Sequence, residues 1–164
     1  MKGAVVMFEI GDKIVHPMHG AGVVSEIQVQ RINGVNRQYY VLRIPSGDMC
    51  VMIPTINCQE IGVRAIIDSD RAEALLGEMT DIEIDMTSNW NRRYRENMLR
   101  IKSGDLIEVA KVIKGLMARE QKQGLSTGER KMLNSAKNIL ISEIVLAQSS
   151  SYETVEERVT RALA

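Results

Sequence analysis

The sequence predicts an α+β protein in which a small bent β-sheet or barrel precedes an all-helical domain. The first third of the chain holds short runs of β-branched residues separated by Gly, Pro and Asn turns. From about residue 70 onward, apolar residues recur instead at the three- and four-residue spacing of amphipathic helices. With 164 residues, of which 45% are hydrophobic and 26% charged, the chain is long enough to bury the necessary core.

Strands are expected in residues 1–60, and the predicted runs are Lys13 to His16, Val23 to Ile32, Gln38 to Ile44 and Met49 to Ile53. The Asn33-Gly34 dipeptide between the second and third runs is typical of a tight hairpin turn. Pro54 ends the last run, because proline cannot donate to a strand ladder. Short strands joined by such turns favour an antiparallel meander.

Five helices are expected in residues 61–164: Asp70 to Met79, Asn89 to Lys102, one from Asp105 to Gly124, one from Ser126 to the serines at 149–151, and a final helix from Tyr152. Ser126-Thr127-Gly128-Glu129 fits a capping box, in which the serine hydroxyl accepts from the glutamate backbone while the glutamate side chain reaches back. Strands followed by helices favour separate β and α parts, with a boundary near residues 54–67.

The charge distribution suggests an anionic partner for one part of the chain only. The formal net charge is zero, yet residues 67–85 hold seven acidic and one basic residue, and residues 86–104 hold five basic and one acidic. No apolar run approaches the roughly 20 residues of a membrane span, and we expect a cytoplasmic protein that contacts no membrane.

Enzyme motifs are nearly lacking, so we expect neither catalysis nor a cofactor. The chain has no phosphate-binding GxxxxGK[ST], and the glycines after His19 only begin a dinucleotide fingerprint. His16, His19, Cys50 and Cys58 are zinc-ligand types, but no close Cys-x-x-Cys pair accompanies the histidines. We therefore expect loop histidines, buried or half-buried free thiols and no metal.

The segment from Asn89 to Arg95 is the most informative. On a helix, Arg92, Arg95 and Lys102 share one face, and Trp90 begins the opposite stripe of Tyr94, Met98 and Ile101. Trp90 is then either a core residue or an exposed ring beside arginines, able to stack on a nucleic-acid base. Arg130 and Lys131 add a second basic pair in the first turn of the following helix.

In order and spacing, five strings resemble the CarD family of bacterial transcription regulators, including its CdnL subgroup: GDKIVHPMHGAGVV, GVR from Gly62, NWNRRYREN, SGD from Ser103 and GLSTGERKML from Gly124. The resemblance covers about Phe8 to Leu146. It implies a Tudor-like β domain, similar to that of the transcription-repair coupling factor, which docks on the β subunit of RNA polymerase by strand addition. It also implies that the helical domain contacts promoter DNA.

The family tryptophan that aligns with Trp90 acts as a minor-groove wedge at the upstream edge of the transcription bubble. On this basis the expected DNA contacts, largely independent of sequence, are Trp90, Arg92, Arg93, Arg95, Arg130 and Lys131. The expected polymerase contacts lie on two strand runs: Gln28, Val29, Gln30, Arg31, Ile32, Met49, Val51, Met52 and Ile53. Some relatives have basic residues where Gln30 and Met52 stand, and Met49 and Met52 are equally compatible with core positions.

The resulting hypothesis is a non-enzymatic regulator that stabilises the open promoter complex, is monomeric when free, and associates with the nucleoid through RNA polymerase. Two alternatives remain open from the sequence. A protein-interaction adaptor would bury Trp90 and make the arginines dispensable. A conventional sequence-specific regulator would need a recognition helix with base-reading side chains, and no clear set of them is present.

Overall fold

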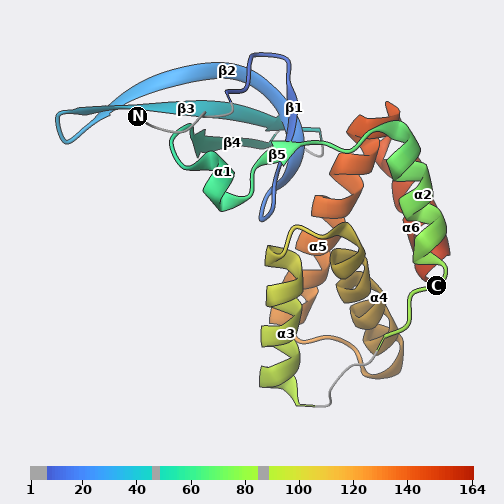
Figure 1. The fold of residues 1–164 in the computed structure, drawn as a ribbon. Helices are drawn as coiled ribbons and strands as arrows, with labels where there is room; N and C mark the ends of the chain where they lie inside the picture. Colours follow the sequence, from blue (N-terminus) through green and yellow to red (C-terminus); the bar gives the residue numbers. More distant parts are fainter. Residues whose placement is uncertain (1–6, 46–48, 85–88) are drawn as a thin grey trace.

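A computed structural model describes residues 7–45, 49–84 and 89–164 of the chain. An antiparallel sheet forms the N-terminal part and a group of helices forms the C-terminal part (Figure 1). The predicted α+β class is therefore confirmed.

Five strands form the sheet in the order β4-β3-β2-β1-β5: β1 (Lys13–His16), β2 (Gly20–Ile32), β3 (Val35–Ile44), β4 (Met49–Pro54) and β5 (Arg64–Ala65). The predicted hairpin turn is confirmed, because Ile32 pairs with Val35, and Asn33 and Gly34 both take positive φ values of 52° and 79°. Two central residues with positive φ match the right-handed twist of the strands that they join.

The sheet is bent, and its longest hairpin extends beyond the other strands. Within β2, only Gly20 to Val23 pair with β1, and within β3 only Tyr39 to Ile44 pair with β4, so the ends of these two strands continue as a two-stranded ribbon (Figure 1). A register shift between Val24 and Glu26 marks a bulge just beyond the part of β2 that pairs with β1. At Gly22 an added Cβ would lie 2.4 Å from the Arg43 backbone oxygen, so the sheet needs glycine there.

Two short elements absent from the sequence prediction lie between the sheet and the long helices. α1 (Cys58–Ile61) is a single turn, and β5 pairs with β1 through the partners Ile14↔Ala65 and Val15↔Arg64. The sheet therefore reaches Ala65, beyond the expected domain limit at residue 60. A two-residue strand has no periodicity that a sequence pattern can reveal.

All five predicted helices are present: α2 (Ser69–Met79), α3 (Trp90–Lys102), α4 (Leu106–Gln123), α5 (Thr127–Gln148) and α6 (Tyr152–Leu163). Each begins at a side chain that accepts a hydrogen bond from a backbone N–H of the first turn, and these N-caps are Asp68, Asn89, Asp105, Ser126 and Ser151. Local capping thus explains why these helices begin where they do.

Each part has its own buried cluster. The sheet surrounds residues such as Ile14, Tyr40 and Leu42, and the helical cluster includes Ile113 and Leu140 of the central helices α4 and α5. Two separate clusters agree with two domains, since each domain requires its own hydrophobic core.

Helix α5 also joins the two domains (Figure 1). The buried Ser142 hydroxyl accepts a hydrogen bond from the Ala21 backbone at 2.9 Å. Next to it, the fully buried Glu143 carboxylate accepts two bonds from the Arg64 guanidinium, at 2.8 and 3.1 Å, and one from the Ile67 backbone at 2.9 Å. These directional contacts hold the helical domain at a defined orientation to the sheet.

Candidate nucleic-acid and protein interfaces

Trp90 lies at the first position of α3 and is 42% exposed. The Asn89 side chain caps the helix by accepting from the Arg92 backbone at 2.9 Å, which places Trp90 outside the packed interior. The interpretation of Trp90 as a core residue is therefore wrong. A large ring that remains this accessible is available to a partner.

The indole of Trp90 rests where the N-terminal ends of α3 and α5 meet. Its ring stacks on Tyr94, with centroids 5.1 Å apart and an interplanar angle of 20°. Its Nε1 donates to the Ser126 hydroxyl at 3.2 Å. An added Cβ on Gly128 would lie 3.8 Å from Trp90 and 3.7 Å from Tyr94, so both rings lie over this glycine.

Arg93 does not belong to the exposed basic surface, so the expected contact of this residue with DNA is wrong. Its side chain is 1% exposed, and its Nε donates to the Glu129 carboxylate at 2.8 Å. Arg93, Asn97 and Ile101 are all buried and recur at four-residue spacing, so they form the inner face of α3. The inner stripe is thus displaced from the predicted one, in which Tyr94 and Met98 are only half-buried.

Glu129 is the buried acceptor at the start of α5. Burial opposes its ionisation, but the hydrogen bonds and charge of Arg93, with a further contribution from Arg119, outweigh burial and lower the pKa of Glu129. The first half of the predicted capping box is confirmed, because Ser126 Oγ accepts from the Glu129 backbone at 3.2 Å. The Glu129 carboxylate was predicted to reach back along the helix. It also forms ion pairs with Arg93 and Arg119.

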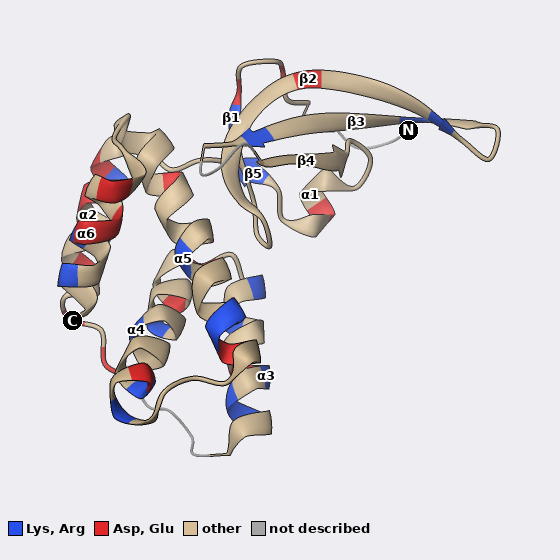
Figure 2. Ribbon diagram, turned by 180° about the vertical axis from the view of Figure 1, so that it is seen from behind, with Lys and Arg blue, Asp and Glu red and all other residues tan. Residues whose placement is uncertain are grey.

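The other predicted DNA contacts are exposed, namely Arg92, Arg95, Arg130 and Lys131. Arg92 Nε contacts Glu96 at 3.0 Å, and Arg130 contacts Glu120 at 2.9 Å. Exposed pairs of this kind contribute at most about 1 kcal/mol, so a phosphate can replace the carboxylate. Figure 2 shows mainly basic positions on α3, whereas acidic positions gather on α2 and α6.

A groove that the sequence did not reveal adjoins Trp90. It has a volume of about 230 Å³ and lies between α3, α5 and the turn that joins β1 to β2. Its lining is largely apolar apart from the Lys131 and Ser135 side chains, and includes Met18, Tyr94, Met98 and Met132. The groove continues the surface that carries the tryptophan toward the β domain.

In the β domain, β4 is an edge strand. Met49 and Met52 are 45% and 40% exposed, so the interpretation of these methionines as core residues is wrong. The Ile53 side chain is buried in the sheet core, so only its backbone remains for the expected polymerase contact. Val51 is half-buried. The edge is therefore lined by flexible apolar side chains that adapt to a partner.

The second expected docking run, Gln28 to Ile32, lies on the projecting part of β2. No strand in the described part of the chain pairs with its outer edge, which is opposite to that of β4 in the strand order. A single added strand therefore pairs with one of these edges but not with both. The runs still approach across the bent sheet, because Gln30 Nε2 lies 3.7 Å from Met52 Sδ.

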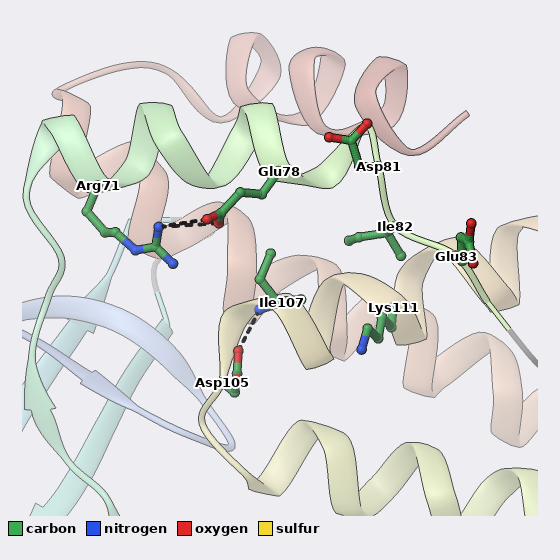
Figure 3. Close-up of a pocket in the computed structure, with 8 residues that line it drawn as sticks. All are labelled: Arg71, Glu78, Asp81, Ile82, Glu83, Asp105, Ile107 and Lys111. Atoms are coloured by element: carbon green, nitrogen blue, oxygen red, sulfur yellow. Dashed lines mark hydrogen bonds and ion pairs between the residues drawn. The ribbon is translucent and has the colours of Figure 1, made fainter.

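An open pocket of about 650 Å³ lies between α2 and α4 (Figure 3). Three of its charged residues have structural partners: Arg71 pairs with Glu78 at 3.2 Å, and Asp105 accepts from the Ile107 backbone as the cap of α4. The remaining charged residues of the lining are Asp81, Glu83 and Lys111.

The histidines and cysteines do not assemble a metal site within the residues that the structure describes. The His16 and His19 rings lie 4.5 Å apart, and the Met18 backbone donates to His16 Nδ1 at 3.0 Å. Cys58 is buried as expected, which raises the pKa of its thiol, whereas the expected burial of Cys50 is wrong because this residue is exposed. Among the described helices, none has the length and apolarity to cross a bilayer.

Two protein-family models match the chain. The model described as the CarD-like/TRCF RID domain matches residues 8–67, and the model described as CarD, C-terminal domain, matches residues 63–160. The chain is also 37% identical, over 138 residues, to the Bacillus subtilis (strain 168) protein named "Putative transcription factor YdeB". That similarity covers 84% of this chain and 90% of the relative. The two matched ranges overlap at β5, the last strand before the long helices.

Proposed function

Because the chain belongs to the CarD family of transcription factors, we propose that it docks on the RNA polymerase β subunit and stabilises the open promoter complex. In this proposal the β domain holds the polymerase and the helical domain holds DNA at the upstream edge of the transcription bubble. The observation that carries the proposal is the exposed Trp90 beside basic side chains at the meeting point of α3 and α5.

Docking by strand addition is supported by the open edge of β4. The Thr55 backbone donates to the Gln38 oxygen at 3.0 Å, in the same register that pairs Tyr40 with Ile53. Because hydrogen-bonded and non-hydrogen-bonded pairs alternate along an antiparallel ladder, Cys50 and Met52 direct their backbone groups outward. An incoming strand gains main-chain hydrogen bonds there, while the exposed methionines adjust to its side chains.

On DNA, Trp90 acts as a wedge that stacks at the fork and obstructs reannealing. Stacking on a base is worth about 1–3 kcal/mol, which corresponds to a change in open-complex lifetime of about tenfold to a hundredfold. Arg92, Arg95, Arg130 and Lys131 hold phosphates, which positions the domain without reading sequence. A protein that binds the open complex better than the closed one shifts the equilibrium by that difference in affinity.

The rigid contact between the domains supports a division of labour. The bonds from Glu143 to Arg64 and Ile67 fix where Trp90 lies relative to the docking edge. Docking then raises the effective concentration of the helical domain near the promoter, so weak contacts with DNA suffice. This explains how a chain of zero net charge acts on DNA.

The adaptor hypothesis predicted a buried Trp90, and the exposure of this ring removes that support. A conventional sequence-specific regulator would bind an isolated duplex tightly. A chain with zero net charge and no clear set of base-reading side chains does not favour such binding.

The test is the lifetime of open complexes formed by the cognate RNA polymerase, measured without addition, with this protein, and with Trp90→Ala. We expect a longer lifetime that the substitution largely removes while polymerase binding persists. Leu99→Ala is the matched control, because Leu99 is 64% exposed on the same helix and should leave the lifetime unchanged. No gain in lifetime despite measured docking would refute the open-complex mechanism.

A further inference from the structure

We propose that Ser126 is a positioning residue that fixes the orientation of the Trp90 indole before DNA arrives. This inference rests on the proposed function and adds to it a specific device for the wedge. It begins from the bond between Trp90 Nε1 and Ser126 Oγ, which joins the first turn of α3 to the N-cap of α5.

The Ser126 hydroxyl uses its full hydrogen-bonding capacity. It accepts from Trp90 Nε1 and from the Glu129 backbone, both at 3.2 Å, and donates to Glu129 Oε1 at 3.4 Å. A hydroxyl has one donor and two acceptor positions, and these three contacts use all of them although Ser126 itself is exposed. Donation to the carboxylate turns both lone pairs toward the two N–H groups, which gives the indole one preferred partner direction.

The carboxylate that orients the hydroxyl is itself immobilised. Glu129 is 1% exposed and is held by Arg93 at 2.8 Å. Arg119 approaches it at 3.6 Å from α4. The orientation of an exposed indole therefore depends on a buried ion-pair cluster, which gives Arg93 a supporting role in place of the expected DNA contact.

Tyr94 and Gly128 restrict the remaining freedom of the ring. Tyr94 stacks on one face of the indole, and Gly128 lies at ordinary contact distance from the edges of both rings. Ordering a side chain before binding removes part of the entropy loss of association. A ring already held at the helix end thus stacks at the fork at a lower entropic cost than a freely rotating one.

The test uses Ser126→Gly, because glycine is nearly as good an N-cap as serine but has no hydroxyl. Ser126→Thr restores the hydroxyl, and Thr127→Ala is the matched control at the exposed neighbouring position. Trp90 is the single tryptophan of the chain, so its indole N–H resonance and fluorescence anisotropy report on this side chain alone in the free protein.

For Ser126→Gly we expect a shifted, faster-exchanging indole N–H resonance, lower anisotropy, and an open-complex lifetime gain reduced about two- to tenfold. Ser126→Thr should restore all three readouts, and Thr127→Ala should alter none. An unchanged indole signal in Ser126→Gly would overturn the inference, as would a released indole with an undiminished lifetime gain.

Trp90→Ala separates this inference from the proposed function. If Trp90→Ala abolishes the lifetime gain and Ser126→Gly leaves it intact, positioning by Ser126 is refuted while the wedge stands. If Trp90→Ala has no effect on lifetime, the wedge itself is refuted and the positioning role with it.

Discussion

Removing the Glu143 carboxylate should destabilise the protein and loosen the junction between its two domains. Glu143→Ala deletes the buried acceptor of three hydrogen bonds, two from Arg64 and one from the Ile67 backbone. The carboxylate belongs to α5 of the helical domain, whereas Arg64 lies on β5 of the sheet. The substitution therefore acts on the contact that sets the orientation of the domains.

The expected cost follows from the exposure of each partner. Removing one partner of a fully buried ion pair lowers the free energy of unfolding by about 3–5 kcal/mol. Glu143 has no exposure, but the Arg64 side chain is 38% exposed, so its guanidinium can return to water. The remaining cost comes mainly from the orphaned Ile67 N–H and the lost packing of Glu143. We therefore expect a loss of about 2–3 kcal/mol.

The assay is urea unfolding followed by the fluorescence of Trp90, which reports on the helical domain that contains Glu143. The predicted loss lowers the midpoint by about 1 M. Glu157→Ala is the matched control, because Glu157 pairs with Arg161 on the surface and its side chain is 70% exposed. That control should cost less than about 0.5 kcal/mol. Equal midpoints for the two variants would refute the structural role of the Glu143 contact.

Three further predictions concern other parts of the molecule. Gly22→Ala should cost about 3 kcal/mol in urea unfolding, because its Cβ would collide with the Arg43 backbone, whereas Gly77→Ala, with open space on a helix, should be neutral or stabilising. Since the pKa of Glu129 is lowered in the folded state, its stabilisation is present above about pH 4.5 and is lost at lower pH. Glu129→Gln should thus lower stability at neutral pH and flatten the dependence of stability on pH below about pH 4.5; parallel profiles would contradict this. Met52→Pro removes an outward N–H from β4 and should weaken polymerase binding about tenfold, with an unchanged circular dichroism spectrum. Unchanged affinity would exclude strand addition at that edge.

The helices could be predicted from the sequence because their signals are local. Apolar spacing marks the inner face of α4, and side chains such as Asp105 and Ser126 stand directly before the helices that they cap. The same is true of the Asn33-Gly34 hairpin. These features depend on neighbours within a few residues, so a single sequence contains them.

The features that the sequence did not reveal depend on distant partners. Arg93 was expected on the surface because it is charged, but Glu129, 36 residues further along the chain, neutralises it in the interior. The sequence indicated Glu129 only as the second member of a capping box. Likewise, β5 is defined by pairing with β1 rather than by its own composition. The exposure of Met52 follows from the position of β4 at the edge of the sheet.

The central claim is that Trp90 contacts DNA at the upstream edge of the bubble while the β domain holds the polymerase. It is tested most directly by placing a photo-crosslinking amino acid at position 90 and mapping its products in open and closed promoter complexes. We predict crosslinks to nucleotides at the upstream fork, present in open complexes and lost on competition with unmodified protein. Crosslinks to polymerase alone, or equal crosslinking along duplex DNA, would contradict the account.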